Sequence, residues 1–185
     1  MDVQSLDLPG VKLLTPRRFA DARGYFAESY NARAFAEATG GVEFVQDNES
    51  LSEHVGTVRG LHYQAPPFAQ AKLVRVVQGA VFDVAVDVRK GSPTYGRWTG
   101  AELSADNGRQ LFVPAGFLHG FVTRAPETLV LYKVDNYYDR DSDGAVHWLS
   151  PSLAVDWGLD PQAAVLSAKD AAAPYFSDFE TPFVA

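Results

Sequence analysis

The residues of this chain that can move protons or carry charge are spread along its length. The chain has four histidines and no cysteine, which excludes disulfides, thiolate metal sites and cysteine nucleophiles. The segment Arg59-Gly-Leu-His62-Tyr-Gln64 combines an imidazole with a cation. In a regular strand His62 faces away from Arg59, but a bulge at Gly60 would turn Arg59 toward the side of His62. On this segment alone, a structural histidine is an equally good interpretation.

A second segment has a more specific spacing. Gly108 is followed, after five residues, by Pro114-Ala-Gly116-Phe-Leu-His119. This spacing resembles the second conserved motif of the cupin superfamily, a jelly-roll barrel, with a tight turn at Pro114 and Gly116 and with His119 at the barrel mouth. The first cupin motif should supply His-x-His and a downstream Glu, but the corresponding stretch has only His62. Because a transition metal needs about three protein ligands, we expect no metal.

Short apolar runs separated by turns are typical of an all-β protein. In this chain the 15 Gly and 11 Pro are scattered between such runs. The runs that predict strands are Lys72–Gln78, Val81–Val88, Arg97–Leu103, Gln110–Val113, His119–Thr123 and Thr128–Val134. Within the second run, Asp83 and Asp87 alternate with valines, which predicts a half-buried strand. A helix is predicted at Asn31–Thr39, capped by Asn31 and ended by Gly40-Gly41, with a shorter helical turn at Pro161–Val165.

Composition limits the function classes. Hydrophobic residues make up 46% and charged residues 21%, as in folded globular proteins, and without repeats we expect one domain over residues 1–185. The net charge of −7 argues against nucleic-acid binding, because binding to the phosphate backbone needs a basic face. No apolar run approaches the roughly 18 residues of a membrane span, and the N-terminus lacks a secretory signal. We therefore expect a cytoplasmic protein that contacts no membrane.

Further segments fit one pattern over nearly the whole chain. They are Asp21–Tyr30, Phe44–Ser50, Arg59–Gln64, Lys72–Arg75, Asp83–Arg89, Ser92–Gly96, Pro114–Phe121, Tyr132-Lys133, Tyr137-Tyr138 and Ser167–Pro174. Together they resemble the dTDP-4-dehydrorhamnose 3,5-epimerase family, cupin-fold enzymes of the deoxysugar pathway. So many segments in order are far more specific than any one of them. The resemblance implies an all-β cupin jelly-roll barrel with short peripheral helices, and no cofactor.

The resemblance also implies a mechanism. The family's substrate is a thymidine-diphospho 4-keto-6-deoxyhexose, whose hydrogens beside the ketone are acidic because their loss leaves an enolate. By the family's pattern His62 matches the base, and Asp170 matches the carboxylate that orients it. Tyr132 matches the acid that reprotonates the enolate from the opposite face, and Lys72 matches a cation near the enolate oxygen. Without the resemblance, Tyr132 would be interpreted as a core residue and Lys72 as a solvated one.

Binding contacts follow from the same resemblance. The residues that match the family's nucleotide-sugar contacts are Arg23, Phe26, Glu28, Gln46, Asp47, Asn48, Arg59, His119, Asp143 and Lys169, and Tyr138 matches the aromatic residue that stacks on thymine. The cations in this set, together with Lys72, explain how an acidic protein can hold a diphosphate. Asp143 stands where the family commonly has the longer Glu, and is the weakest match. Family members are homodimers, so we expect a homodimer in which the Arg23–Glu28 segment reaches the neighbouring chain's site.

Other functions fit part of the pattern. A mono-epimerase of another dTDP-deoxysugar pathway would carry nearly the same catalytic residues. A keto-sugar isomerase of related fold would lack the combination of His62, Tyr132 and Asp170. A non-catalytic nucleotide-sugar-binding cupin would keep the cations and lose the acid–base set, whereas both are present here. A metal-dependent cupin oxygenase fits least. Epimerisation of dTDP-4-dehydro-6-deoxy-D-glucose at carbons 3 and 5 fits best.

Overall fold

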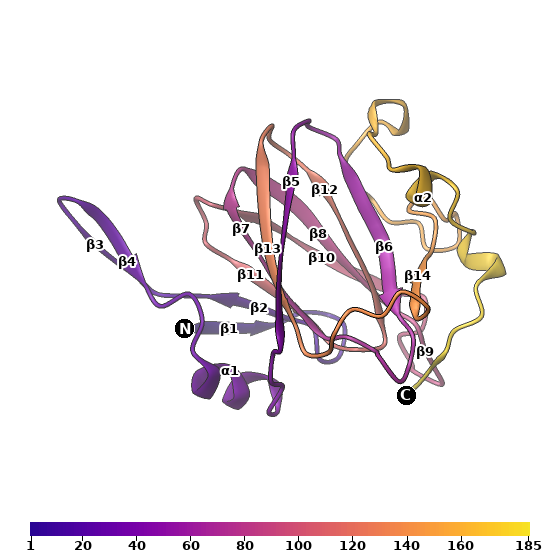
Figure 1. The fold of residues 1–185 in the computed structure, drawn as a ribbon, viewed down its shortest axis with the longest axis horizontal. Helices are drawn as coiled ribbons and strands as arrows, with labels where there is room; N and C mark the ends of the chain where they lie inside the picture. The colour runs from indigo at the N-terminus through magenta and orange to yellow at the C-terminus, as the bar shows by residue number, and fades with distance from the viewer.

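Two antiparallel sheets face each other in the computed structural model, which describes residues 1–185 (Figure 1). The first sheet contains, in spatial order, β1 (Asp2–Ser5), β2 (Lys12–Thr15), β11 (Gln110–Val113), β7 (Lys72–Gln78), β13 (Thr128–Val134) and β5 (Gln46–Ser52). The second contains β10 (Trp98–Ser104), β8 (Ala80–Asp87), β12 (Phe117–Thr123), β6 (Val58–Gln64) and β14 (Asp143–Ala145). Two small pairs complete the set, β3 (Arg18–Asp21) with β4 (Gly24–Ala27) and β9 (Arg89–Lys90) with β15 (Phe183–Val184). The predicted all-β jelly-roll barrel is confirmed.

The helices are few and short. The side chain of Asn31 caps α1 (Ala32–Thr39), and Gly40 ends it with a φ of 83°, as the sequence predicted. Phe35 of this helix is fully buried against the six-stranded sheet. The C-terminal segment, residues 146–185, follows the last long strands and carries η1 (Pro161–Ala163), α2 (Ala168–Ala171) and η2 (Phe176–Asp178). None of the helices is long and apolar enough to cross a membrane.

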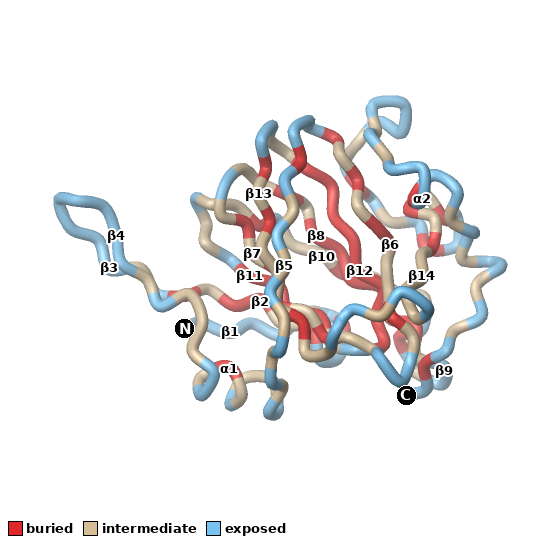
Figure 2. The backbone as a smooth tube through the Cα atoms, in the orientation of Figure 1, coloured by how far each residue is buried: buried red, intermediate tan, exposed pale blue.

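Strand β8, most of which is buried (Figure 2), contributes side chains to two hydrophobic clusters. Val84 and Val86 of β8 pack outward against side chains of the C-terminal segment, among them Trp148 and Trp157. Its Ala85 packs inward, between the sheets. Asp83 and Asp87 share that inner side and are fully buried. The expectation of a half-buried strand was therefore wrong, because both aspartates have partners inside the protein.

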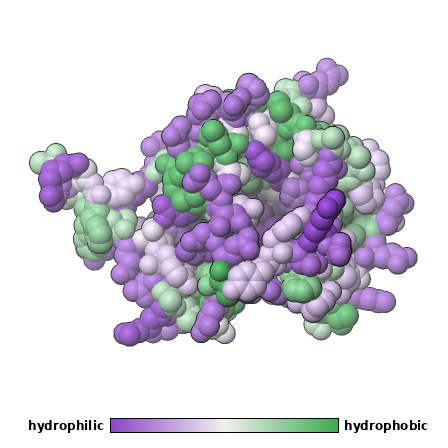
Figure 3. Space-filling model, in the orientation of Figure 1, coloured by the Kyte–Doolittle hydropathy of each residue, from purple (hydrophilic) through white to green (hydrophobic).

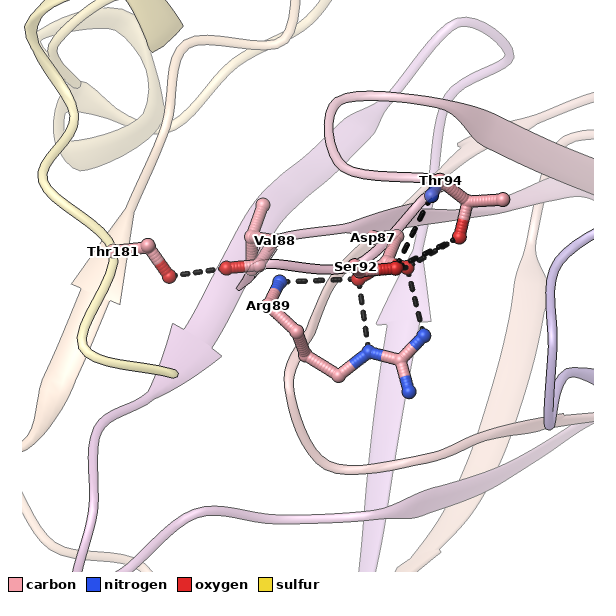
Figure 4. Close-up of polar contacts among 6 residues, drawn as sticks. All are labelled: Asp87, Val88, Arg89, Ser92, Thr94 and Thr181. Atoms are coloured by element: carbon pink, nitrogen blue, oxygen red, sulfur yellow. Dashed lines mark hydrogen bonds and ion pairs between the residues drawn. The ribbon is translucent and has the colours of Figure 1, made fainter. Parts of the chain in front are cut away.

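The end of the C-terminal segment is anchored far from α2. Thr181 donates a hydrogen bond to the carbonyl oxygen of Val88 (Figure 4). Phe183 is 7% exposed, and its ring lies 6.0 Å from that of Tyr63, centroid to centroid. Tyr63 is the neighbour of His62 on β6. The anchored segment therefore stays in contact with the strand that carries His62.

The Asp87 carboxylate organises the turn that follows β8 (Figure 4). Its Oδ1 accepts hydrogen bonds from the backbone N–H and Nε of Arg89 at 3.0 and 2.9 Å. Its Oδ2 accepts from the Arg89 guanidinium at 2.7 Å and from the hydroxyls of Ser92 and Thr94, each at 2.5 Å. Burial alone would raise the pKa of Asp87, but these hydrogen bonds outweigh burial and hold its pKa well below the usual range.

Replacing this carboxylate should destabilise the fold in a pH-dependent way. We expect Asp87→Asn to lower the free energy of unfolding at pH 7 by about 1.5 to 3 kcal/mol, the range for hydrogen bonds to a charged group. Because the folded pKa is depressed, the carboxylate's contribution is complete above the unfolded pKa of about 4 and is lost as the pH falls below it. Urea unfolding of both proteins between pH 7 and pH 3.5 should show the difference shrinking with acid.

The exposed Asp7 provides the matched control, since Asp7→Asn should leave stability unchanged. A difference between wild type and Asp87→Asn that stays constant with pH would contradict the electrostatic account.

Candidate active site

A cavity of about 370 Å³ opens between the two sheets. Hydrophilic side chains gather over the middle of the face seen in Figure 3. The polar residues that line the cavity are Arg59 and His62 on β6, His119 on β12, Lys72 on β7, Tyr132 on β13, Ser50 on β5, Thr57, and Ser167, Lys169 and Asp170 at α2. All four residues with a predicted catalytic role are therefore found around one cavity.

Strand β6 has the bulge at Gly60 that the sequence allowed. Arg59 and His62 are three residues apart on β6, whereas their partners on β12 are only two apart. Gly60 has a φ of 128°, and a Cβ there would come within 2.6 Å of the Cα of Gly120. Only glycine fits this position. As a result, Arg59 and His62 both line the cavity.

His62 is held by a buried carboxylate. Its Nε2 lies 2.5 Å from Oδ1 of Asp170, a residue that is 3% exposed. Burial alone would raise the pKa of Asp170, but hydrogen bonds from His62 and Ser167 lower it below the usual value. An ionised carboxylate can only accept hydrogen bonds, so Nε2 of His62 carries the hydrogen. In the neutral imidazole, Nδ1 is then the nitrogen without a hydrogen, and no hydrogen bond within the chain occupies it.

A second histidine–aspartate pair lies deeper. Nε2 of His119 is 2.6 Å from Oδ1 of Asp83, and Oδ2 of Asp83 is buried without a hydrogen-bond partner. Asp83 was not among the predicted site residues. Its alternation with the valines of β8 was visible in the sequence, but that pattern did not show which side of the strand faces the interior of the barrel. The hydroxyl of Ser50 is also unpartnered and lines the cavity. The chain contains no group of three or more His, Asp or Glu side chains arranged to hold a metal ion.

Burial shifts the pKa values of two further groups in the cavity, Lys72 and Tyr132. It lowers the pKa of Lys72 to about 8, against the opposing charges of Asp83 and Asp143. It also raises the pKa of Tyr132 above its usual value. Tyr132 pairs with Asn48 on β5, so it belongs to the six-stranded sheet, whereas His62 belongs to the five-stranded one. The phenol and the imidazole therefore approach the cavity from opposite walls.

Arg59 brings an uncompensated positive charge. Its Nε donates to the Ser52 hydroxyl at 3.1 Å, and its terminal nitrogen donates to the Leu51 carbonyl at 2.8 Å. Neither acceptor is charged, and Arg59 has no ion-pair partner in the chain. The guanidinium is thus fixed in direction while its charge remains available to an anion.

A chain of polar contacts leads from the cavity to an exposed aromatic ring. Lys169 donates to Oδ2 of Asp143 at 2.5 Å, and the hydroxyl of Tyr138 lies 3.4 Å from the same oxygen. The backbone N–H of Tyr138 donates to Gln46, whose amide donates to Asn48 at 2.8 Å. The ring of Tyr138 is 59% exposed, which leaves it free to stack on a planar ligand.

Four of the predicted binding residues neither line the cavity nor belong to this chain of polar contacts. Asp47 is exposed and pairs with Lys133 at 2.8 Å, and neither residue lines this cavity. Arg23, Phe26 and Glu28 belong to or follow the β3–β4 hairpin, which projects from the barrel as an arm (Figure 1). The side chain of Phe26 is 70% exposed. Within one chain, these residues do not reach the cavity.

Comparison with known proteins gives one consistent result. The family model described as dTDP-4-dehydrorhamnose 3,5-epimerase matches residues 5–178. An enzyme of that name from Sinorhizobium fredii is 50% identical over 185 residues, which are 99% of this chain and 93% of the relative. The crystal structure of the Bacillus anthracis enzyme with TDP and PPi bound has 49% identity and a TM-score of 0.91, covering 95% of this chain and 99% of the other.

A structure from Legionella pneumophila, a dTDP-6-deoxy-D-glucose-3,5-epimerase in complex with dTDP-4-keto-L-rhamnose, has 43% identity and a TM-score of 0.92, covering 97% of this chain and 94% of the other. Matches of this identity over nearly the full length, on the same fold, establish kinship. The chain belongs to the dTDP-4-dehydrorhamnose 3,5-epimerase family, isomerases of dTDP-rhamnose nucleotide-sugar biosynthesis.

Proposed function

We propose that the chain converts dTDP-4-dehydro-6-deoxy-D-glucose to dTDP-4-dehydro-L-rhamnose by inverting carbons 3 and 5, without a cofactor. The observation that carries the proposal is the position of His62 and Tyr132 on opposite walls of one cavity. Inversion of a carbon requires that a proton leave from one face of the sugar ring and return to the other. A ring held between the two sheets would present one face to the imidazole and the other to the phenol.

His62 is the proposed base. Nδ1 removes the hydrogen from a carbon beside the ketone, and the electrons of the broken C–H bond form the enolate. The Asp170 carboxylate, 2.5 Å from Nε2, stabilises the imidazolium that results. The same side chain can serve both carbons, because both flank the ketone and the ring can turn between the two steps.

Tyr132 is the proposed acid on the other wall. Because burial raises the pKa of Tyr132, the phenol is protonated at neutral pH and can give its proton to the enolate carbon. The phenolate and the imidazolium then return to their starting states by proton exchange with solvent. Lys72 carries the positive charge that stabilises the enolate oxygen, an interaction that strengthens as charge develops.

The diphosphate and the thymine ring of the substrate require their own contacts. Arg59 and Lys169 provide the cations on this chain, and Arg59 is the one without a carboxylate partner. Tyr138 stacks on thymine, beside the polar side chains of Gln46 and Asn48. Asp143 acts through Lys169, whose ammonium group it holds at 2.5 Å.

The remaining contacts come from a second copy of the chain. A two-stranded hairpin is marginally stable alone, and the β3–β4 arm exposes Phe19, Tyr25 and Phe26, side chains that a partner surface would cover. The chain therefore forms a homodimer in which each arm brings Arg23, Phe26 and Glu28 to the other chain's cavity. Symmetry makes the exchange reciprocal.

Complementation between two inactive variants tests this exchange. Chains carrying Arg23→Ala and His62→Ala are coexpressed with different tags, and the doubly tagged heterodimer is isolated. One of its two cavities then has both native residues, so the heterodimer should recover about half of wild-type activity. If the arm serves its own chain, each cavity carries one defect and the heterodimer is no faster than the Arg23→Ala protein.

The reaction itself is tested with dTDP-4-dehydro-6-deoxy-D-glucose in deuterated water. We expect NMR to show deuterium at both carbons 3 and 5, together with conversion to the L-sugar. Deuterium at one carbon would instead identify a mono-epimerase. No incorporation, with measurable dTDP binding, would indicate a binding module or an enzyme of a different keto sugar, and would contradict the mechanism.

The proposed role of Lys72 predicts an alkaline limit to activity. With a pKa of about 8, the ammonium group is charged below that pH and loses its charge above it. The kcat/KM of the wild type, which reports the free protein, should therefore fall above about pH 8, while the kcat/KM of Lys72→Met should be about 100-fold lower at pH 7 and lack that decline. A decline near pH 8 that persists in Lys72→Met would assign it to another group.

A further inference from the structure

The second oxygen of the Asp170 carboxylate has a partner that the mechanism does not use. Oδ1 faces His62, and Oδ2 accepts a hydrogen bond from the hydroxyl of Ser167 at 2.9 Å. The same hydroxyl accepts a hydrogen bond from the backbone N–H of Asp170 at 3.0 Å. Ser167 therefore contacts Asp170 twice, once at its side chain and once at its backbone.

The backbone contact decides where Asp170 sits. Ser167 has extended backbone angles, φ −71° and ψ 158°, and is the N-cap of α2, the position at which serine is strongly preferred. Helix α2 spans only Ala168–Ala171, and a helix this short has almost no stability of its own. The Ser167 cap is thus the local contact that holds Asp170 in a helical turn.

The side-chain contact decides how the carboxylate is turned. Rotation about the last side-chain bond of an aspartate is soft, because sp³–sp² torsions have broad minima. A donor on Oδ2 fixes that rotation and leaves Oδ1 directed at Nε2 of His62. Since the ionised carboxylate keeps the hydrogen on Nε2, its orientation also determines that Nδ1 is the free nitrogen.

We propose that Ser167 is a positioning residue: its hydroxyl fixes the Asp170 carboxylate so that His62 presents Nδ1 to the sugar. The proposal rests on the proposed role of His62 as the base. It differs from a role in substrate binding, which the presence of Ser167 in the cavity wall would also allow. A positioning residue changes turnover, whereas a substrate contact changes affinity.

Three substitutions separate these roles. Ser167→Ala removes the hydroxyl, Ser167→Gly removes it while retaining a residue that is tolerated at an N-cap, and Ser167→Thr keeps it. We expect kcat to fall about 10- to 100-fold in the Ala and Gly variants, the size of effect seen for side chains that orient metal-ligating histidines. KM and the Kd for dTDP should change less than about twofold, and Ser167→Thr should restore most of kcat. Thermal unfolding checks that each variant is folded.

A spectroscopic measurement follows the geometry directly. The Nε2–H proton of His62, assigned by its loss in His62→Gln, should resonate at low field in the wild type and in Ser167→Thr. It should shift or broaden in Ser167→Ala and Ser167→Gly. An unchanged signal with wild-type kcat in Ser167→Gly would overturn the proposal, as would a raised KM with kcat unchanged. If His62→Ala retained turnover, the catalytic assignment would fail, but the His62 signal would still show whether Ser167 orients Asp170.

Discussion

The contact between His62 and Asp170 is the interaction on which the proposed mechanism depends, and much of the packing of the chain holds these two residues together. It joins β6 to α2 across 108 positions of sequence, and a helix of one turn cannot hold its place alone. The C-terminal segment, which carries α2, is held in place because Trp148 and Trp157 are buried against the outer face of the five-stranded sheet. Phe183 packs beside Tyr63 of β6 and anchors the end of the chain. Apolar packing outside the barrel thus supports the contact of 2.5 Å between Nε2 of His62 and Oδ1 of Asp170 inside it.

The carboxylates near the cavity are each held by another side chain. Asp170 and Asp83 lie within hydrogen-bonding distance of a histidine, and Asp143 pairs with Lys169. Arg59 is different, because its guanidinium is oriented by neutral acceptors. An acidic chain with a net charge of −7 can therefore present local positive charge where a diphosphate would lie. The overall charge says little about such a site.

The sequence predicted those features whose signals are local. Alternation and turn residues predicted the strands 72–78, 110–113 and 128–134 with their bounds, and Gly60 marked the bulge. Prediction failed where residues distant in sequence determine the burial of a side chain. The side of β8 that carries Asp83 and Asp87 was expected to be exposed but is buried, and the sequence could not show that Asp47 pairs with Lys133. The catalytic residues were reached through family resemblance rather than from local pattern. Ser167 lies in one of the matching segments but was given no role, although Ser-x-x-Asp is a spacing that local capping rules can detect.

The central claim is that two side chains on opposite walls divide the proton transfer between them, and isotope exchange in the two single variants tests it most directly. Tyr132→Phe and His62→Ala are incubated with dTDP-4-dehydro-6-deoxy-D-glucose in deuterated water, and the recovered sugar is examined by NMR. The account predicts that Tyr132→Phe incorporates deuterium without inversion, since His62 still removes the proton and returns deuterium to the same face. His62→Ala should do neither. Equal loss of exchange and inversion in Tyr132→Phe, or exchange that persists in His62→Ala, would contradict it.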